Sequence, residues 1–136
     1  AIGLMQLMPA TAKWVAKQSG RADYRPSRIN DVDVNTQFGA FYFRYWLDRL
    51  DGSWALAAAA YNAGPGRAQA WRPAAELDGA AWVETIPFNE TRDYVKKVLA
   101  NSVYYAHALG DPSVDVRQRL GTVGPRTPAG SLVAKD

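Results

Sequence analysis

The amino-acid sequence predicts an all-α domain. Apolar residues recur at helical spacing in several segments, and Gly and Pro residues separate these segments. No segment shows the alternation of apolar and polar residues that a half-buried strand requires. The length of 136 residues matches one ordinary domain, and a composition of 48% hydrophobic and 21% charged residues is globular. We therefore expect a single core built from packed helices.

The N-terminal part predicts one short helix followed by a loop. Pro9 suits the first turn of a helix, where its missing N–H costs nothing. The helix is expected to run from Ala10 to Gln18 and to end near Gly20. Residues 21–32 contain several turn-forming residues, so we expect them to form a loop.

Residues 34–50 give the clearest helical signal. Their polar positions form one narrow stripe, and apolar or aromatic residues cover nearly all of the remaining surface. A helix that is apolar most of the way round is typical of a buried position. We therefore expect this helix to be the central one, ended by Gly52. The polar stripe consists of Gln37, Arg44, Asp48 and Asp51.

The second half of the sequence predicts four further helices. Ser53 is a good N-cap for a helix over residues 54–62, where a run of alanines allows close approach of a neighbouring backbone. Shorter helices are expected up to Trp71 and over residues 79–85, and a long one runs from residue 89 or 90 to 109. Gly and Pro residues crowd the end, so we expect a domain over residues 1–110 and an irregular or disordered tail over 111–136.

The composition also narrows the classes of function. Cysteine is absent and His107 is the single histidine, so neither a disulfide framework nor a structural zinc site is expected. No apolar stretch reaches the roughly 20 residues that a membrane-spanning helix needs. Sixteen basic and 13 acidic residues leave a net charge of +3, which suits an acidic polymer but is too weak to indicate nucleic acid.

Three segments, residues 3–12, 59–66 and 84–95, carry polar groups that packing alone does not require. Each segment also has an ordinary structural interpretation, as a loop amide, a helix end and a helix N-terminus respectively. Together they offer amide, phenol and carboxylate groups, which suit sugar hydroxyls and N-acetyl groups but would fit many polar ligands. These groups belong to Gln6, Tyr61, Asn62, Glu84 and Tyr94.

The three segments resemble three motifs of the lytic transglycosylase catalytic domain (SLT domain) of glycoside hydrolase family 23. Residues 3–9 (GLMQLMP), 60–66 (AYNAGPG) and 84–95 (ETIPFNETRDYV) follow the family's order at similar spacings. The resemblance extends over about residues 1–110. It implies a lysozyme-like helical fold of the goose-type lysozyme and SLT kind, and the glycan strand of bacterial peptidoglycan as the substrate.

The resemblance also implies a reaction that uses no water. The C6 hydroxyl of N-acetylmuramic acid attacks its own C1 and displaces N-acetylglucosamine from the β-1,4 bond, which leaves a 1,6-anhydro end. One glutamate can then serve as acid and afterwards as base. In the family this glutamate stands upstream of the position of Gly3, before Ala1. We therefore expect an N-terminally truncated domain, inactive alone, with no catalytic residue among Glu76, Glu84 and Glu90.

The resemblance implies no cofactor and no metal. The expected partner is the peptidoglycan glycan strand, with no nucleic acid and no membrane span, and the expected form is a monomer in the periplasm or cell envelope. Two alternatives stay open: a non-catalytic peptidoglycan-binding module, and a goose-type lysozyme-like hydrolase that would add one water to its products. By motif match, the substrate-binding residues are Gln6, Met8, Tyr61, Asn62, Glu84 and Tyr94.

Overall fold

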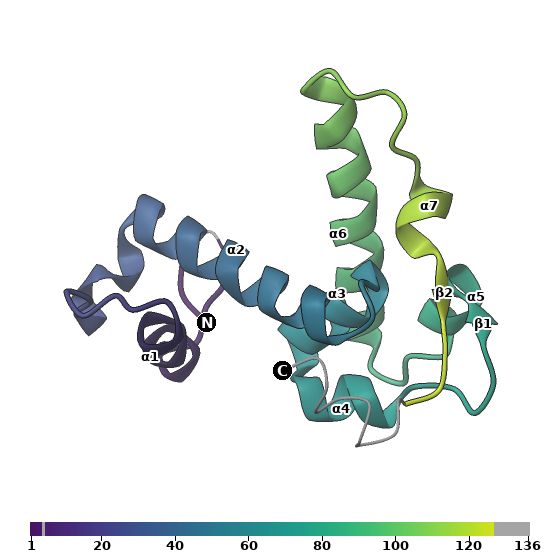
Figure 1. Cartoon of the computed structure of the whole chain (residues 1–136), viewed down its shortest axis with the longest axis horizontal. Coiled ribbons are helices and arrows are strands. Elements are labelled where there is room, and N and C mark those ends of the chain that lie inside the picture. Colours follow the sequence, from purple (N-terminus) through teal and green to yellow (C-terminus); the bar gives the residue numbers. More distant parts are fainter. Residues whose placement is uncertain (4, 127–136) are drawn as a thin grey trace. The chain divides into compact units, whose positions relative to one another are not determined.

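A computed structural model describes residues 1–3 and 5–126 (Figure 1). The chain divides into two compact units, of which the first covers Ala1–Tyr45 and the second begins at Trp46. Helices dominate both units, as the sequence predicts, and each unit is described by itself.

The first unit is built from a helix near its N-terminus, a short 3-10 helix and a long helix at its C-terminal end. Helix α1 covers Pro9–Gln18 and begins with the proline that the sequence places there. Residues 21–32 are not entirely loop as predicted, because a 3-10 helix, η1, covers Pro26–Asn30. Helix α2 covers Val32–Arg49 and extends past the boundary of the unit. The buried apolar side chains of this unit include Leu7, Val15, Ile29, Val34 and Phe38.

Helix α2 is less buried than its apolar surface predicts. Its buried residues are confined to the first half, from Val34 to Gly39. The aromatic residues that follow are half-buried, and in this unit Trp14 packs edge-on against Tyr42 and Tyr45 at ring-centroid distances of 5.8 and 4.7 Å. Large aromatic rings thus pack against one another beside the second half of the helix without being enclosed, so the predicted burial is found in the first half of the helix only.

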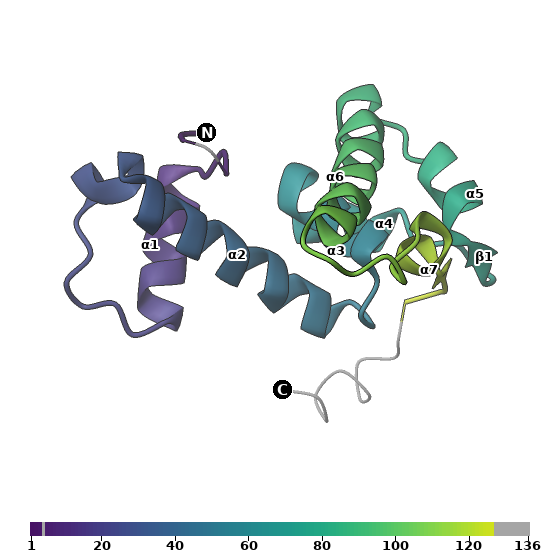
Figure 2. The same cartoon turned by 90° about the horizontal axis from the view of Figure 1, so that it is seen from above.

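The second unit is built on two helices, α3 (Trp54–Ala63) and α6 (Asn89–Ala108), which pack against each other (Figure 2). All six residues from Ala55 to Ala60 are buried, so thin side chains allow this close approach. The Ser53 hydroxyl accepts a hydrogen bond from Leu56 N at 3.1 Å, which is the predicted N-cap. The shorter elements are α4 (Pro65–Ala70), β1 (Leu77–Asp78), α5 (Gly79–Glu84), α7 (Val116–Leu120) and β2 (Thr122–Val123).

The segment after residue 111 has more structure than the sequence predicts. Helix α7 packs beside α3, α5 and α6, and strand β2 pairs antiparallel with β1, with Leu77 opposite Val123. The Arg72 side chain, 4% exposed, donates from Nε to the Gly124 carbonyl at 2.9 Å and from Nη2 to Asp51 at 2.6 Å. Residues 116–124 are therefore an ordered part of the second unit. Residues 127–136 of the predicted tail lie outside the described residues.

Candidate functional site

The first motif forms a closed loop before α1. Ile2 and Leu7 exchange two backbone hydrogen bonds, of 2.7 and 3.0 Å, so Gly3, Met5 and Gln6 lie in a tight turn. Gln6 lies in the left-handed region, with φ of 51°, and its side-chain amide donates to the Gly3 carbonyl at 2.8 Å. Met8 follows as the residue that precedes α1, and its side chain is 55% exposed. Both predicted substrate-binding side chains of this motif are thus on the surface of the first unit.

A buried amide from α2 holds this loop. Asn35 is 1% exposed, and its Oδ1 accepts a hydrogen bond from Met5 N at 2.7 Å. Its Nδ2 donates to the carbonyls of Ile2 and Ile29, at 2.9 and 3.1 Å. A Cβ on Gly3 would lie 2.4 Å from that same Nδ2, which requires glycine there. The sequence analysis did not select Asn35, although a polar residue among the apolar positions of a helix is the signal that could have identified it.

The second and third motifs meet in the second unit. Tyr61 and Asn62 stand at the end of α3 and Tyr94 on α6, and the rings of Tyr61 and Tyr94 are nearly parallel, 15° apart, at a centroid distance of 6.3 Å. The Asn62 Oδ1 accepts a hydrogen bond at 2.7 Å from the hydroxyl of Thr91, which is buried. Burial raises the pKa of the Tyr94 phenol, so this group remains a neutral hydrogen-bond donor at physiological pH. Three of the predicted site residues are therefore brought together.

A surface depression of about 310 Å³ lies beside two of these residues. Asn62 and Tyr94 line it, together with three charged side chains that the sequence analysis did not assign to the site, Glu90, Asp93 and Lys97. The four α6 residues stand at positions i, i+3, i+4 and i+7, which places them on one face of the helix. Helical spacing from Tyr94 is the signal that could have found them.

Glu84 has a different environment. It is the last residue of α5, and its carboxylate accepts a hydrogen bond from the Lys96 ammonium at 2.6 Å. That hydrogen bond, with the positive charge that makes it, holds the pKa of Glu84 below its usual range. Glu84 is not among the residues that line the depression at Asn62 and Tyr94. Its ion pair joins α5 to α6.

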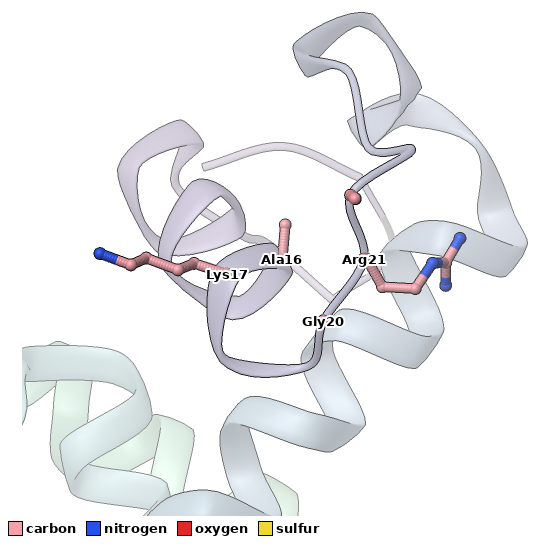
Figure 3. Close-up of a pocket in the computed structure, with 5 residues that line it drawn as sticks. Ala16, Lys17, Gly20 and Arg21 are labelled. Carbon is pink, nitrogen blue, oxygen red and sulfur yellow. The ribbon is translucent and has the colours of Figure 1, made fainter.

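The first unit has a depression of its own, of about 230 Å³, at the end of α1 (Figure 3). Its lining includes Lys17 and Arg21, whose side chains extend in opposite directions in Figure 3. The Arg21 guanidinium is already bound to Asp23 at 3.2 Å and to the Gln37 amide oxygen at 3.0 Å. Because the two cations diverge and one is paired, this depression offers no convergent set of ligand-binding groups.

Across residues 1–3 and 5–126, no group of three or more His, Asp or Glu side chains could hold a metal ion. The same described residues include no helix that is both long and apolar enough to cross a membrane.

The family model of the Transglycosylase SLT domain matches residues 1–80, which is more than half of the chain. The chain belongs to this family. A second family model, the Soluble lytic transglycosylase helical domain, matches residues 85–113. The first match contains Gln6, Met8, Tyr61 and Asn62, and the second contains Tyr94.

Relatives in bacteria support the same family. A soluble lytic murein transglycosylase of Salmonella typhimurium is 44% identical over 113 residues, which cover 81% of this chain. The crystal structure of an inactive mutant of the lytic transglycosylase Slt from Pseudomonas aeruginosa superposes with a TM-score of 0.79 at 39% identity, over 91% of this chain and 20% of that one. The 70-kDa soluble lytic transglycosylase of Escherichia coli has a TM-score of 0.73 at 36% identity, over 87% of this chain and 19% of that one.

These structural neighbours confirm the predicted all-α, lysozyme-like SLT fold. The chain spans only 18% of the length of the Salmonella relative. Within the chain, Gln6 and Met8 belong to the first unit, whereas Tyr61, Asn62, Glu84 and Tyr94 belong to the second.

Proposed function

We propose that this chain is the glycan-binding part of a peptidoglycan lytic transglycosylase, which breaks the bond from N-acetylmuramic acid to N-acetylglucosamine without water. The observation that carries the proposal is that Tyr61, Asn62 and Tyr94, which come from two separate family motifs, lie together, and that Asn62 and Tyr94 line one depression. Their phenol and amide groups are donors and acceptors for sugar hydroxyls and N-acetyl groups. Gln6 and Met8, both on the surface of the first unit, are proposed by motif match alone to contact the glycan as well.

In this proposal the acid-base glutamate lies outside the 136 residues. A general acid must keep its proton at neutral pH, which requires an apolar environment. Glu76, Glu84 and Glu90 are all exposed, and Lys96 favours the ionised form of Glu84. None of them therefore meets the requirement. Glu84 is assigned to the contact between α5 and α6 rather than to the glycan.

The proposed enzyme acts on the cell wall, in the periplasm or at the cell envelope, as a monomer. The reaction needs neither a cofactor nor a metal ion, because the C6 hydroxyl of the substrate is the nucleophile. One carboxyl group protonates the leaving oxygen and then accepts the proton of the C6 hydroxyl.

The test is digestion of purified peptidoglycan sacculi by the full-length protein, with the products analysed by mass spectrometry. We expect 1,6-anhydro products, one water lighter than hydrolysed ones, and none from the 136-residue chain alone. Hydrolysed products would show a lysozyme-like hydrolase instead. Binding to sacculi without any cleavage by the full-length protein would show a non-catalytic module.

A pair of tyrosine variants tests the site itself. Tyr61→Phe removes one hydroxyl from the proposed cleft, and we expect up to about a tenfold slower reaction, the value of one neutral hydrogen bond. The matched control is Tyr104→Phe, because Tyr104 is 69% exposed and its ring packs against Tyr105 rather than against Tyr94. Equal rates for the two variants would remove Tyr61 from the site.

A further inference from the structure

We propose that Asn35 is a positioning residue for the reaction, which acts through Gln6. Asn35 and Gly39 stand at positions i and i+4 of α2 and form one anchoring face of that helix. This face holds the Gln6 turn, the tight turn that contains Gly3, Met5 and Gln6. The inference rests on the proposed function, because the conformation of the turn affects turnover only if Gln6 contacts the glycan.

The Asn35 amide binds the turn through both of its polar atoms. Its Oδ1 accepts a hydrogen bond from Met5 N at 2.7 Å, and its Nδ2 donates to the Ile2 carbonyl at 2.9 Å. A second bond from Nδ2, of 3.1 Å, reaches the Ile29 carbonyl in η1 and holds the amide itself in place. Asn35 is 1% exposed, so water does not compete for these bonds. A buried amide with all its partners permits one placement of the turn, whereas apolar contacts alone would allow it to slide.

Two glycines allow the turn and α2 to approach each other. A Cβ on Gly39 would lie 2.6 Å from the Cβ of Met5, and a Cβ on Gly3 would lie 2.4 Å from the Nδ2 of Asn35. Both distances are shorter than real Cβ atoms allow. Glycine inside a helix lowers its stability. The contact with the turn gives a physical reason for Gly39 within the 18-residue helix α2.

The conformation that this face holds is an unusual one. Gln6 has a φ of 51°, in the left-handed region that residues with a Cβ rarely adopt. Such a backbone persists only where its surroundings hold it. The Gln6 side chain is exposed, and its Nε2 donates one hydrogen bond, to the Gly3 carbonyl at 2.8 Å. Among residues 1–3 and 5–126, its Oε1 and second N–H have no partner, so they remain available to an N-acetyl group or a sugar hydroxyl.

The two ends of the turn are held without the anchoring face. Ile2 and Leu7 bond to each other through their backbones, at 2.7 and 3.0 Å, and Leu7 is 1% exposed. Loss of the Asn35 contacts should therefore displace Met5 and Gln6 while the ends stay paired. Because a binding group must be held closely in its productive geometry, this displacement should slow the reaction through Gln6.

The experiment is a double-mutant cycle between Asn35→Asp and Gln6→Ala in the full-length protein. The rate of 1,6-anhydro product release from sacculi is measured below the unfolding transition of each variant. Aspartate keeps the shape of asparagine but loses at least one of the two donated bonds in either protonation state. We expect each single variant to be about tenfold slower. In Gln6→Ala, the added Asn35→Asp should slow the reaction by less than about twofold, while its loss of stability to urea remains.

A second variant disturbs the anchoring face without touching the amide. Gly39→Ala adds a Cβ against Met5 and should show the same dependence on Gln6, which decides the question if Asn35→Asp does not fold. Two controls should leave the rate unchanged. Asn101→Asp makes the same replacement on the exposed surface of α6, and Gly124→Ala adds a Cβ where nothing lies within 4 Å.

The outcomes separate this inference from the function on which it rests. Equal slowing by Asn35→Asp with and without Gln6→Ala would overturn the inference, because the asparagine would then serve the fold alone. An unchanged rate in Gln6→Ala, or in both variants of the anchoring face, would overturn it as well. In each of these cases the unaltered protein still releases anhydro products, so the proposed function stands. If the unaltered full-length protein released none, the proposed function itself would be wrong, and the inference with it.

Discussion

The two units of the chain hold their motif residues by different means. In the first unit, the loop with Gln6 is fixed through one side chain, Asn35, which makes three hydrogen bonds from a buried position. In the second unit, Tyr61 and Asn62 stand at the end of a helix whose buried alanines pack against α6. One hydrogen bond, from Thr91 to Asn62, adds to that packing.

This difference shows how sensitive each region is to a single substitution. A loop that depends on one amide loses most of its support when that amide is removed, because backbone groups remain buried without a partner. A helix end supported by many apolar contacts loses only a fraction of its support with any one group. The first unit is therefore expected to be the more easily disrupted by a polar substitution.

The largest effect is expected from Asn35→Ala. The substitution removes three hydrogen bonds and leaves the N–H of Met5 and the carbonyl of Ile29 without the Asn35 partner, while the Ile2 carbonyl keeps its bond from Leu7 N, so the free energy of unfolding should fall by about 3 kcal/mol. Urea unfolding followed by tryptophan fluorescence measures the change. Asn101→Ala is the control, since Asn101 is an exposed asparagine of α6. A loss as small as that of the control would show that the loop holds its own conformation.

The sequence predicts most of the helices because each depends on a local signal. Pro9 begins α1 and Ser53 caps α3 as predicted, since caps act within one helical turn. The segment from Val116 to Val123 was missed because its five-residue helix and two-residue strand are too short for periodicity to register. Its order comes from distant partners such as Arg72, which binds the Gly124 carbonyl.

The candidate site likewise combines residues that the sequence could identify with environments that only the fold determines. The motif residues Tyr61, Asn62 and Tyr94 could be selected from the sequence because they stand within recognisable segments. The sequence could not show that Glu84 and Glu90 have different environments, because both occur in the same motif, six positions apart. Helix geometry decides between them: Glu90 shares a face of α6 with Tyr94, whereas Glu84 ends α5 and pairs with Lys96.

A smaller effect is expected from Thr91→Val in the second unit. The substitution keeps the shape of the side chain and removes only the hydrogen bond to Asn62, so stability should fall by about 1 kcal/mol, clearly less than for Asn35→Ala. Thr36→Val is the control, because it makes the same replacement of a hydroxyl by a methyl group on the exposed surface of α2. A loss as large as that of Asn35→Ala would contradict the difference between the units.

The smallest effect concerns the exposed pair of Glu84 and Lys96, which NMR titration of the Glu84 side chain measures directly. Lys96 lowers the pKa of this carboxyl in the folded chain, so the pair contributes stability above the unfolded pKa and loses it as pH falls through the folded pKa. Lys96→Met should return the pKa upward toward its usual value and remove this acid dependence. Because both side chains are exposed, high salt should weaken the effect in the unaltered chain. A Glu84 pKa that is the same in Lys96→Met and in the unaltered chain would show that the pair does not persist in solution. Helix α5 would then be held by apolar packing alone, as the many apolar contacts of the second unit allow.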